Sequence, residues 1–219
     1  MADLALTPIR RSTSLTQDVM DRLWKAILNG ELEEGASLPE ALTATKLGVS
    51  RVPVREALVE LERQGLVEFD RNGRACVRTF TVEDGTELIS LRAALQRMAA
   101  RLAAQKLTDA DVARLEAILD RARETHDLTA FSALDSAFHD EIVVIARHKR
   151  LDRLWTDVRN QFQLWLARIH RRRESVLHDV RQATLKSHRE MIEVFKTRKP
   201  DLAGDLMERH CSWSSFPDK

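Results

Sequence analysis

The spacing of apolar residues predicts three short helices at the start of the chain. Over residues 15–28 the apolar side chains recur every three or four positions, as on one face of a helix. A shorter helix fits residues 39–47 and stops at Gly48. A third is expected to begin after Ser50, which can cap it, and to run to about Gln64 before Gly65. Pro53 is tolerated in this helix because it lies in the first turn.

The pattern then changes from helix to strand. The segment VEFDRNGRACVR is typical of two short strands joined by a turn at Asn72-Gly73. Residues 15–78 are therefore predicted to form three helices followed by a β-hairpin, behind a flexible tail over residues 1–14. Residues 79–83 are expected to be a linker.

From residue 84 to the end of the chain, a second domain with only helical patterns is expected. Thr81 and Asp84 have the spacing of a capping box, which predicts a helix start. Helices fit residues 82–106, 109–124, 128–146, 151–169, 175–196 and 201–213. Short polar breaks between them favour an antiparallel helical bundle. The chain is thus expected to be mostly α, with one small hairpin.

Composition narrows the class of protein without identifying a partner. The 219 residues carry 35 Lys and Arg against 34 Asp and Glu, so a nucleic-acid surface would have to be local. The two cysteines fit no motif, which favours a reducing compartment. We see no secretory signal and no apolar run of roughly 20 residues. A cytoplasmic protein with no membrane partner is therefore expected.

Arginines near the start of the third predicted helix are candidate DNA contacts. Arg51 and Arg55 are four residues apart and share a face, and the Ser50 hydroxyl and helix N-terminus favour phosphate oxygens. Guanidinium groups on such a helix can bond guanine bidentately in the major groove. Arg71 and Arg74 at the hairpin tip could reach a neighbouring groove or phosphate. Spacing alone equally allows an amphipathic helix with a solvated arginine face.

The segment LGVSRVPVREALVELERQGLVEF closely resembles the signature of the GntR family. The resemblance covers residues 15–78 and implies a winged helix-turn-helix that binds operator DNA. It implies that Ser50, Arg51, Pro53 and Arg55 approach DNA and that Gly73 lies in the wing. Such proteins normally meet a two-fold operator, so a homodimer is expected. Some members carry a DNA-contacting arginine where this chain has Ala41.

Histidines in the second domain are candidate metal ligands. Asp135 and His139, in LDSAFHDEIV, are one helical turn apart and can face one site, as a divalent-metal pair does. His188 and His210 lie at equal distances on either side of the break near Pro200. In a helical hairpin they would reach a similar height, so the four side chains could converge. A buried Asp–His hydrogen bond or a surface ion pair would leave the same pattern.

This region resembles the FCD ligand-binding domain of FadR-type GntR regulators. Asp135, His139, His188 and His210 fall on that family's four metal positions, and Arg92 matches an arginine that helps to hold a carboxylate effector. The resemblance implies a divalent metal, with Zn favoured and Ni or Mn as alternatives. Where many members have Leu-Glu, this chain has Leu95-Gln96. Six predicted helices favour the VanR-like branch over the seven-helix FadR branch.

Three functions remain open from these patterns. The first is a transcriptional regulator, in the repressor mode, whose DNA affinity is controlled by a small carboxylate bound at the metal. The second is a metal-dependent hydrolase, since such a site can activate water. No nucleophile elbow, H-E-x-x-H or phosphate loop supports the hydrolase, and no catalytic residues are assigned. The third is a regulator whose metal is purely structural.

Overall fold

The computed structural model describes residues 13–172 and 177–212. The chain divides into two compact units between Thr79 and Phe80. The predicted tail falls mostly on residues 1–12, which lie outside the described residues. So do the predicted start of a helix at Ser175 and the predicted end of another at Trp213.

The first unit has three helices, α1 (Thr13–Leu28), α2 (Glu40–Leu47) and α3 (Arg51–Arg63). Its core includes Val19, Leu23 and Ile27 of α1, which are the positions that the helical period predicts. Gly48 follows α2 in the left-handed conformation, where its amide bonds the last carbonyls of the helix. Ser50 occupies the N-cap position of α3, but its side chain makes no capping hydrogen bond. The predicted N-cap position is therefore confirmed, but the predicted hydrogen bond from the Ser50 side chain is absent.

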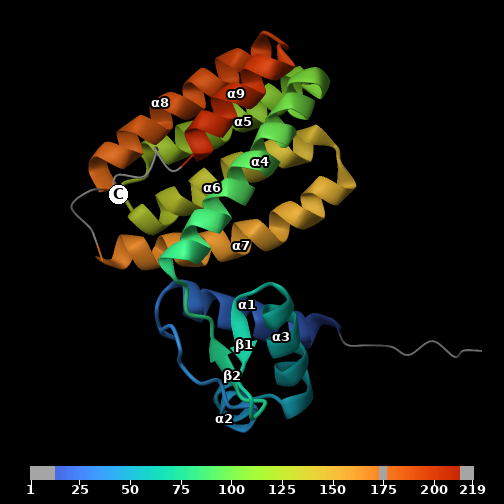
Figure 1. Ribbon diagram of the computed structural model, residues 1–219, viewed down its shortest axis with the longest axis vertical. Coiled ribbons are helices and arrows are strands. Elements are labelled where there is room, and N and C mark those ends of the chain that lie inside the picture. Colours follow the sequence, from blue (N-terminus) through green and yellow to red (C-terminus); the bar gives the residue numbers. More distant parts are fainter. Residues whose placement is uncertain (1–12, 173–176, 213–219) are drawn as a thin grey trace, which may run out of the picture. The chain divides into compact units, whose positions relative to one another are not determined.

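A two-stranded antiparallel hairpin completes this unit (Figure 1). Strand β1 (Val67–Phe69) pairs with β2 (Ala75–Val77), with Phe69 opposite Ala75. The Asp70 amide donates to the Arg74 carbonyl at 2.9 Å, and the Gly73 amide donates to the Asp70 carbonyl at 2.9 Å. Gly73 has φ 72°, so the loop is a β-turn followed by a left-handed residue, for which glycine is suited.

The second unit is a bundle of helices within the part of the chain that the structure describes (Figure 1). The observed bounds of α4 (Val82–Lys106), α5 (Asp109–Glu124) and α6 (Leu128–Ala146) agree with the sequence pattern. The other three are α7 (Lys149–Arg172), α8 (Leu177–Lys196) and α9 (Pro200–Cys211). The predicted capping box of α4 is present, with Thr81 and Asp84 bonded reciprocally.

Arginines take the left-handed positions at two breaks in the bundle, where the sequence has no glycine. Arg147 ends α6 with φ 47°, and Arg198 lies between α8 and α9 with φ 53°. Helix α7 begins two residues earlier than its apolar pattern predicts. The His148 ring nitrogen accepts a hydrogen bond from the Leu151 amide at 3.1 Å, so the imidazole caps the N-terminus of α7.

Helix α4 is the central element of the bundle, since it packs against α6, α7, α8 and α9. Small residues make this possible, because Ala99, Ala100, Ala103 and Ala104 are all fully buried and let neighbouring helices come close. Larger apolar side chains fill the space around them, among them Phe138, Ile142 and Phe195. The core thus extends along α6, α8 and α9, the three helices that carry the four candidate ligands.

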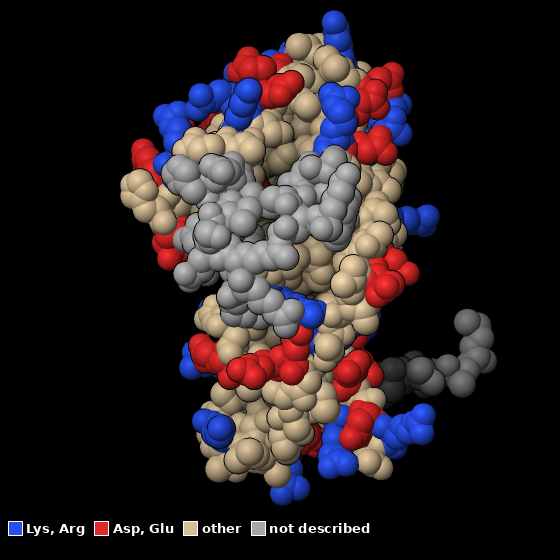
Figure 2. Space-filling view, turned by 60° about the vertical axis from the view of Figure 1, so that its left-hand side comes forward, with Lys and Arg blue, Asp and Glu red and all other residues tan. Residues whose placement is uncertain are grey.

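Basic and acidic side chains lie next to one another around the upper part of the face of the bundle shown in Figure 2. This agrees with the near balance of 35 basic and 34 acidic residues. Among the described residues, no helix combines the length and the apolar character needed to cross a membrane.

Candidate functional site

The start of α3 presents a basic, solvent-exposed face. Arg51 and Arg55 are exposed one turn apart, and Ser50 is exposed at the N-cap. On the opposite face Val54, Leu58 and Leu61 are buried, as the sequence predicts. Pro53 is buried with them, so its ring shapes the first turn from inside the unit rather than from its surface. One face of α3 thus packs in the core of the first unit, and the opposite face is exposed to solvent.

The arginines of this unit differ in how tightly they are held. Arg55 Nε lies 3.8 Å from Glu40 Oε1 of α2, and both side chains are solvated, so the pair is weak. At the hairpin tip Arg71 and Gly73 are exposed, and Arg74 pairs with Asp70 at 3.2 Å. Hydrogen bonds from the Arg74 and Asn72 amides hold the pKa of Asp70 below its usual value. Asp70 therefore stays ionised beside Arg74 and offsets part of its charge.

Four candidate metal ligands converge in the bundle. Asp135 and His139 come from α6, His188 from α8 and His210 from α9, and one ligand atom of each lies within 4.8 Å of all the others. His210 Nε2 is 3.2 Å from His188 Nε2 and 3.3 Å from His139 Nε2. Asp135 Oδ1 is 3.4 Å from His188 Nε2. The equal spacing of His188 and His210 from the α8–α9 turn therefore does bring them to the same height.

Neighbouring side chains hold the far sides of these rings. Ser187 Oγ is 2.9 Å from His210 Nδ1, and Gln96 Oε1 is 3.3 Å from His139 Nδ1. Phe138 stacks on the His188 ring with 3.9 Å between centroids and 10° between planes. Each histidine thus turns Nε2 toward the common centre while another group orients its opposite edge or face.

Arg92 lies beside the four ligands. It is 5% exposed, its NH2 is 2.7 Å from His139 Nε2, and its guanidinium stacks over the Phe162 ring at 4.5 Å. Among the described residues, no carboxylate forms an ion pair with it. Because a guanidinium can only donate, His139 Nε2 accepts this hydrogen bond and therefore carries a lone pair rather than a proton.

Electrostatics keep the histidines neutral. Burial, reinforced by the charge of Arg92 and by the neighbouring imidazoles, lowers the pKa of His139 and of His188 well below the usual range. Burial and Arg92 lower the pKa of His210 to about 3. Burial raises the pKa of Asp135, against the opposing effect of Arg92. At neutral pH all three imidazoles can therefore offer a lone pair.

This donor set fits a divalent transition metal. Neutral imidazole nitrogens with one carboxylate oxygen are the ligands that Zn, Ni and Mn accept in proteins. Lone pairs about 3.3 Å apart repel one another unless a cation or a shared proton lies between them, so the cluster itself suits a positive charge. Asp135, His139, His188 and His210 would hold the ion.

The pattern of the sequence did not single out every residue around this centre. From the sequence, Gln96 is only a departure from a resemblance, Phe138 is only the residue before a candidate ligand, and Ser187 has no expected role. Phe138 and Ser187 both flank a candidate ligand in the chain, but neighbours on a helix point about 100° apart. Their part in the site therefore depends on how the helices pack.

Comparison with known proteins finds a matching family for each of the two units of the chain. The family model described as "Bacterial regulatory proteins, gntR family" matches residues 15–77, and the FCD domain model matches residues 87–212. A probable D-xylose utilization operon transcriptional repressor of Paenarthrobacter nicotinovorans is 30% identical over 201 residues, covering 90% of this chain and 86% of that protein. The gluconate operon transcriptional repressor of Bacillus licheniformis is 26% identical over 179 residues, covering 80% and 73%.

Among solved structures, a GntR-type putative transcriptional regulator from Rhodococcus sp. RHA1 superposes with a TM-score of 0.73. It is 28% identical and covers 93% of this chain and 96% of its own. These relatives are regulators rather than enzymes, which removes the support for a hydrolase. Because the two family models together match residues 15–77 and 87–212, the chain belongs to the GntR family of bacterial transcriptional regulators, in its FCD-containing branch.

Proposed function

We propose that this regulator acts as a repressor whose affinity for operator DNA is set by a small carboxylate bound at a metal in the second unit. The observation that carries the proposal is the convergence of three imidazoles and one carboxylate within 4.8 Å, beside a buried arginine. The metal would supply a Lewis-acidic position for an anionic oxygen. Asp135, His139, His188 and His210 would hold it, with Zn favoured over Ni or Mn.

Arg92 explains why the effector should be an anion. A divalent cation held by His139 would lie next to the guanidinium, and two positive charges repel strongly in a buried site. A carboxylate that contacts both removes this repulsion, and its bonds to a guanidinium are charge-assisted and can be bidentate. The gluconate operon named for one relative concerns a compound of this class, which supports a carboxylate but does not identify it.

The four helices that meet at this site could couple effector binding to DNA binding. Ligands from α6, α8 and α9 and the arginine from α4 would be tied together by one bound anion and one metal. We infer that this changes the spacing of the two N-terminal units of a dimer relative to the operator half-sites. Linkage then requires that DNA and effector weaken each other's binding by the same factor.

DNA contact is assigned to the exposed residues of the first unit. Arg51 and Arg55 of α3 would meet the major groove together with Ser50, the N-cap residue of that helix. At the hairpin, a neighbouring groove or phosphate would be contacted by Arg71, Gly73 and Arg74. Pro53, being buried, would set the first turn of α3 without touching bases.

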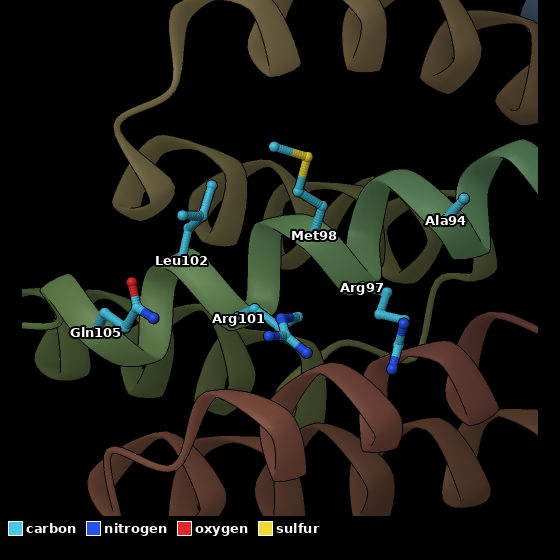
Figure 3. A pocket seen from close by; sticks show the side chains of 6 residues that line it. All are labelled: Ala94, Arg97, Met98, Arg101, Leu102 and Gln105. Atoms are coloured by element: carbon cyan, nitrogen blue, oxygen red, sulfur yellow. The ribbon is translucent and has the colours of Figure 1, made fainter.

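A homodimer is the form in which such a protein would meet a two-fold operator. We propose that the outer face of α4 supplies part of the interface with a second copy. Leu91 and Met98 are 51% and 42% exposed there. Met98 and Leu102 border a depression of about 350 Å³ whose other lining residues are Ala94, Arg97, Arg101 and Gln105 (Figure 3). Arg97 and Arg101 pair with acidic residues of α9, which leaves the apolar side chains of this face available to a partner.

The test is the His188→Ala variant compared with the parent. Metal content is measured by elemental analysis, and affinity is measured for a duplex selected by the parent from a random library, with and without candidate organic acids. We expect loss of metal and of the effector response together, with basal DNA binding retained. Loss of metal with an unchanged response would show that the metal only holds the bundle together.

A further inference from the structure

Two polar side chains outside the four candidate ligands contact histidine rings at Nδ1, on the side that faces away from the cluster. We propose that Ser187 and Gln96 are positioning residues that hold a proton on Nδ1 of His210 and His139. Nε2 of each ring then carries no proton and has a lone pair with which to bind the metal. This inference rests on the proposed metal site and deepens it. Its basis is the set of hydrogen bonds on the side of each ring that faces away from the cluster.

For His139 the protonated nitrogen follows from two independent contacts. The Gln96 amide nitrogen donates to the His139 backbone carbonyl at 3.4 Å, which turns its Oε1 toward the ring. That oxygen lies 3.3 Å from Nδ1 and can only accept, so Nδ1 carries the proton. The Arg92 contact at Nε2 requires the same form of the ring, because a guanidinium only donates. Gln96 is fully buried, so its amide cannot exchange these partners for water.

For His210 the choice depends on one hydroxyl. Ser187 Oγ lies 2.9 Å from Nδ1 and can either donate to it or accept from it. When Ser187 accepts, Nδ1 is protonated and Nε2 is bare, 3.2 Å from His188 Nε2 in the centre of the cluster. Ser187 can therefore serve a metal-binding His210 by accepting the hydrogen bond from Nδ1–H.

His188 is oriented differently, by stacking on Phe138. A different side chain therefore orients each of the three imidazoles. The contacts of Gln96 and Ser187 also determine which ring nitrogen carries the proton, whereas the stacking of Phe138 does not. Partners of this kind on metal-binding histidines typically contribute 10- to 100-fold to metal affinity. The serine and the glutamine should each do so while making no contact with the ion.

The experiment measures Zn²⁺ affinity by competition with a chromophoric chelator for the full-length protein and its variants. We expect Ser187→Ala to bind Zn²⁺ about 10- to 100-fold more weakly than the parent, whereas Ser187→Thr, which keeps the hydroxyl, stays close to it. The matched control is Ser90→Ala. Ser90 is an exposed helical serine whose hydroxyl donates only to its own helix, at the Glu87 carbonyl, and its loss should change nothing.

Gln96 is tested in the same way. Gln96→Leu removes the acceptor for His139 Nδ1–H and should weaken Zn²⁺ by a similar factor, whereas Gln96→Glu keeps an acceptor oxygen at that position and should retain the affinity. Thermal unfolding of the metal-free variants separates a loss of the fold from a loss of positioning. Equal affinity of Ser187→Ala and the parent would overturn the assignment of the serine.

Nitrogen NMR of protein labelled in the histidine rings distinguishes positioning from a purely structural role of Ser187. It reports which ring nitrogen carries the proton, and a purely structural role of Ser187 would not change this. In the Zn²⁺-loaded parent, a slowly exchanging Nδ1–H signal is expected for His210. It should vanish in Ser187→Ala and persist in Ser187→Thr. If the parent binds no Zn²⁺, the proposed metal site itself fails. If the parent binds and His210 coordinates through Nδ1, the metal site stands and only the present inference is wrong.

Discussion

At the scale of single residues, the exposed arginines of α3 are the most informative side chains of the first unit. Arg51 and Arg55 lie on the solvated face of a helix whose other face is buried, so a substitution there should spare the fold. In the proposed DNA complex each would make a bidentate contact with a base edge, and such a contact carries about 1–3 kcal/mol of discrimination.

We expect Arg51→Ala or Arg55→Ala to weaken binding to a library-selected duplex by about 1–3 kcal/mol and to relax specificity at one position. Fluorescence anisotropy and a second round of selection measure both effects. Arg63→Ala is the matched control, since Arg63 lies at the far end of the same helix and pairs with Glu60. Parent-like binding by both variants would show that α3 does not read the bases.

At the scale of elements, the contact between α4 and α7 depends on the absence of a side chain at Gly85. A Cβ at this position would lie 2.5 Å from Trp165 Nε1, on a buried indole with little room to move. Alanine gains about 1 kcal/mol of helix propensity over glycine, whereas overpacking costs about 1–3 kcal/mol.

The overpacking should prevail, so we expect Gly85→Ala to lower the free energy of unfolding by up to about 2 kcal/mol. Gly204→Ala is a second test of the same effect. Its Cβ would meet Arg101 Cγ at 2.6 Å, near the base of a side chain that pairs with Asp201, so this variant should also lose stability. An exposed neighbour of Gly85 on α4 supplies the neutral comparison, and urea denaturation should give a clear loss for Gly85→Ala and little change for Thr86→Ala.

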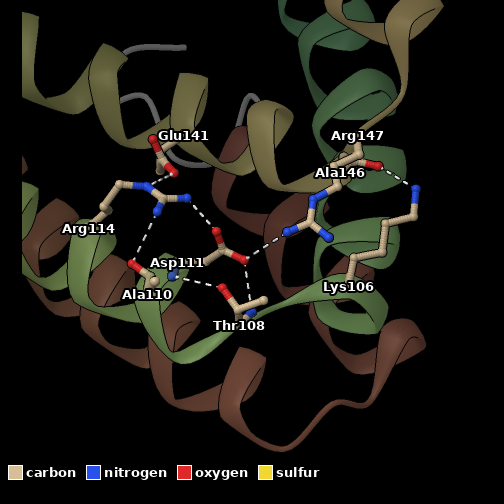
Figure 4. A network of polar contacts seen from close by, with 8 residues as sticks. All are labelled: Lys106, Thr108, Ala110, Asp111, Arg114, Glu141, Ala146 and Arg147. Atoms are coloured by element: carbon tan, nitrogen blue, oxygen red, sulfur yellow. Dashed lines mark hydrogen bonds and ion pairs between the residues drawn. The ribbon is translucent and has the colours of Figure 1, made fainter.

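A polar network connects the start of α5 to the end of α6 (Figure 4). Asp111 accepts from the Thr108 amide at 2.8 Å and pairs with Arg114 and Arg147, and Arg114 also pairs with Glu141 at 2.8 Å. Burial pushes the pKa of Asp111 upward, but the hydrogen bonds from Thr108 and Arg114 outweigh it, so the pKa lies below the usual 3.8.

Because the folded-state pKa is depressed, the contribution of Asp111 to stability is present above pH 3.8 and is lost as pH falls through the lower folded value. Asp111→Asn should cost about 1–3 kcal/mol at pH 7, and the difference from the parent should shrink below pH 4. Asp120→Asn, on the exposed side of α5, should cost under about 0.5 kcal/mol. Urea denaturation at several pH values checks this, and a difference that stays constant down to pH 3 would contradict it.

At the scale of the whole molecule, the proposed dimer rests on apolar side chains that α4 leaves exposed. Placing a charge in the depression beside Leu102 should separate the copies, since an unpaired charge is costly to bury in an interface. Met98→Glu is therefore expected to sediment as a 25.0 kDa monomer at micromolar concentration, where the parent sediments at twice that mass.

Val144→Glu supplies the control for that experiment. Val144 is also exposed and apolar, but it lies on α6 rather than on the outer face of α4. Its substitution should leave the dimer intact. A parent that sediments as a monomer would exclude the dimer altogether, whereas a dimeric Met98→Glu would move the interface away from this face.

The sequence by itself determined the features that depend on local geometry. The bounds of α4, α5 and α6, the capping box at Thr81 and the buried face of α3 all follow from spacings of three or four residues along one helix. The pairing of Asp135 with His139 has the same origin. The meeting of His188 with His210 follows from a short turn between two helices, whose symmetry places equidistant residues side by side.

Only the tertiary structure decided how those side chains are aimed. Ser187 reaches His210 because α8 packs on α9, and Gln96 and Arg92 reach His139 because α4 packs on α6. The left-handed arginines at the helix breaks and the imidazole cap of α7 likewise carry no reliable local signal. Contacts between helices depend on the volumes of buried neighbours such as Phe138 and the small alanines of α4. These are properties of the packed core rather than of any one segment.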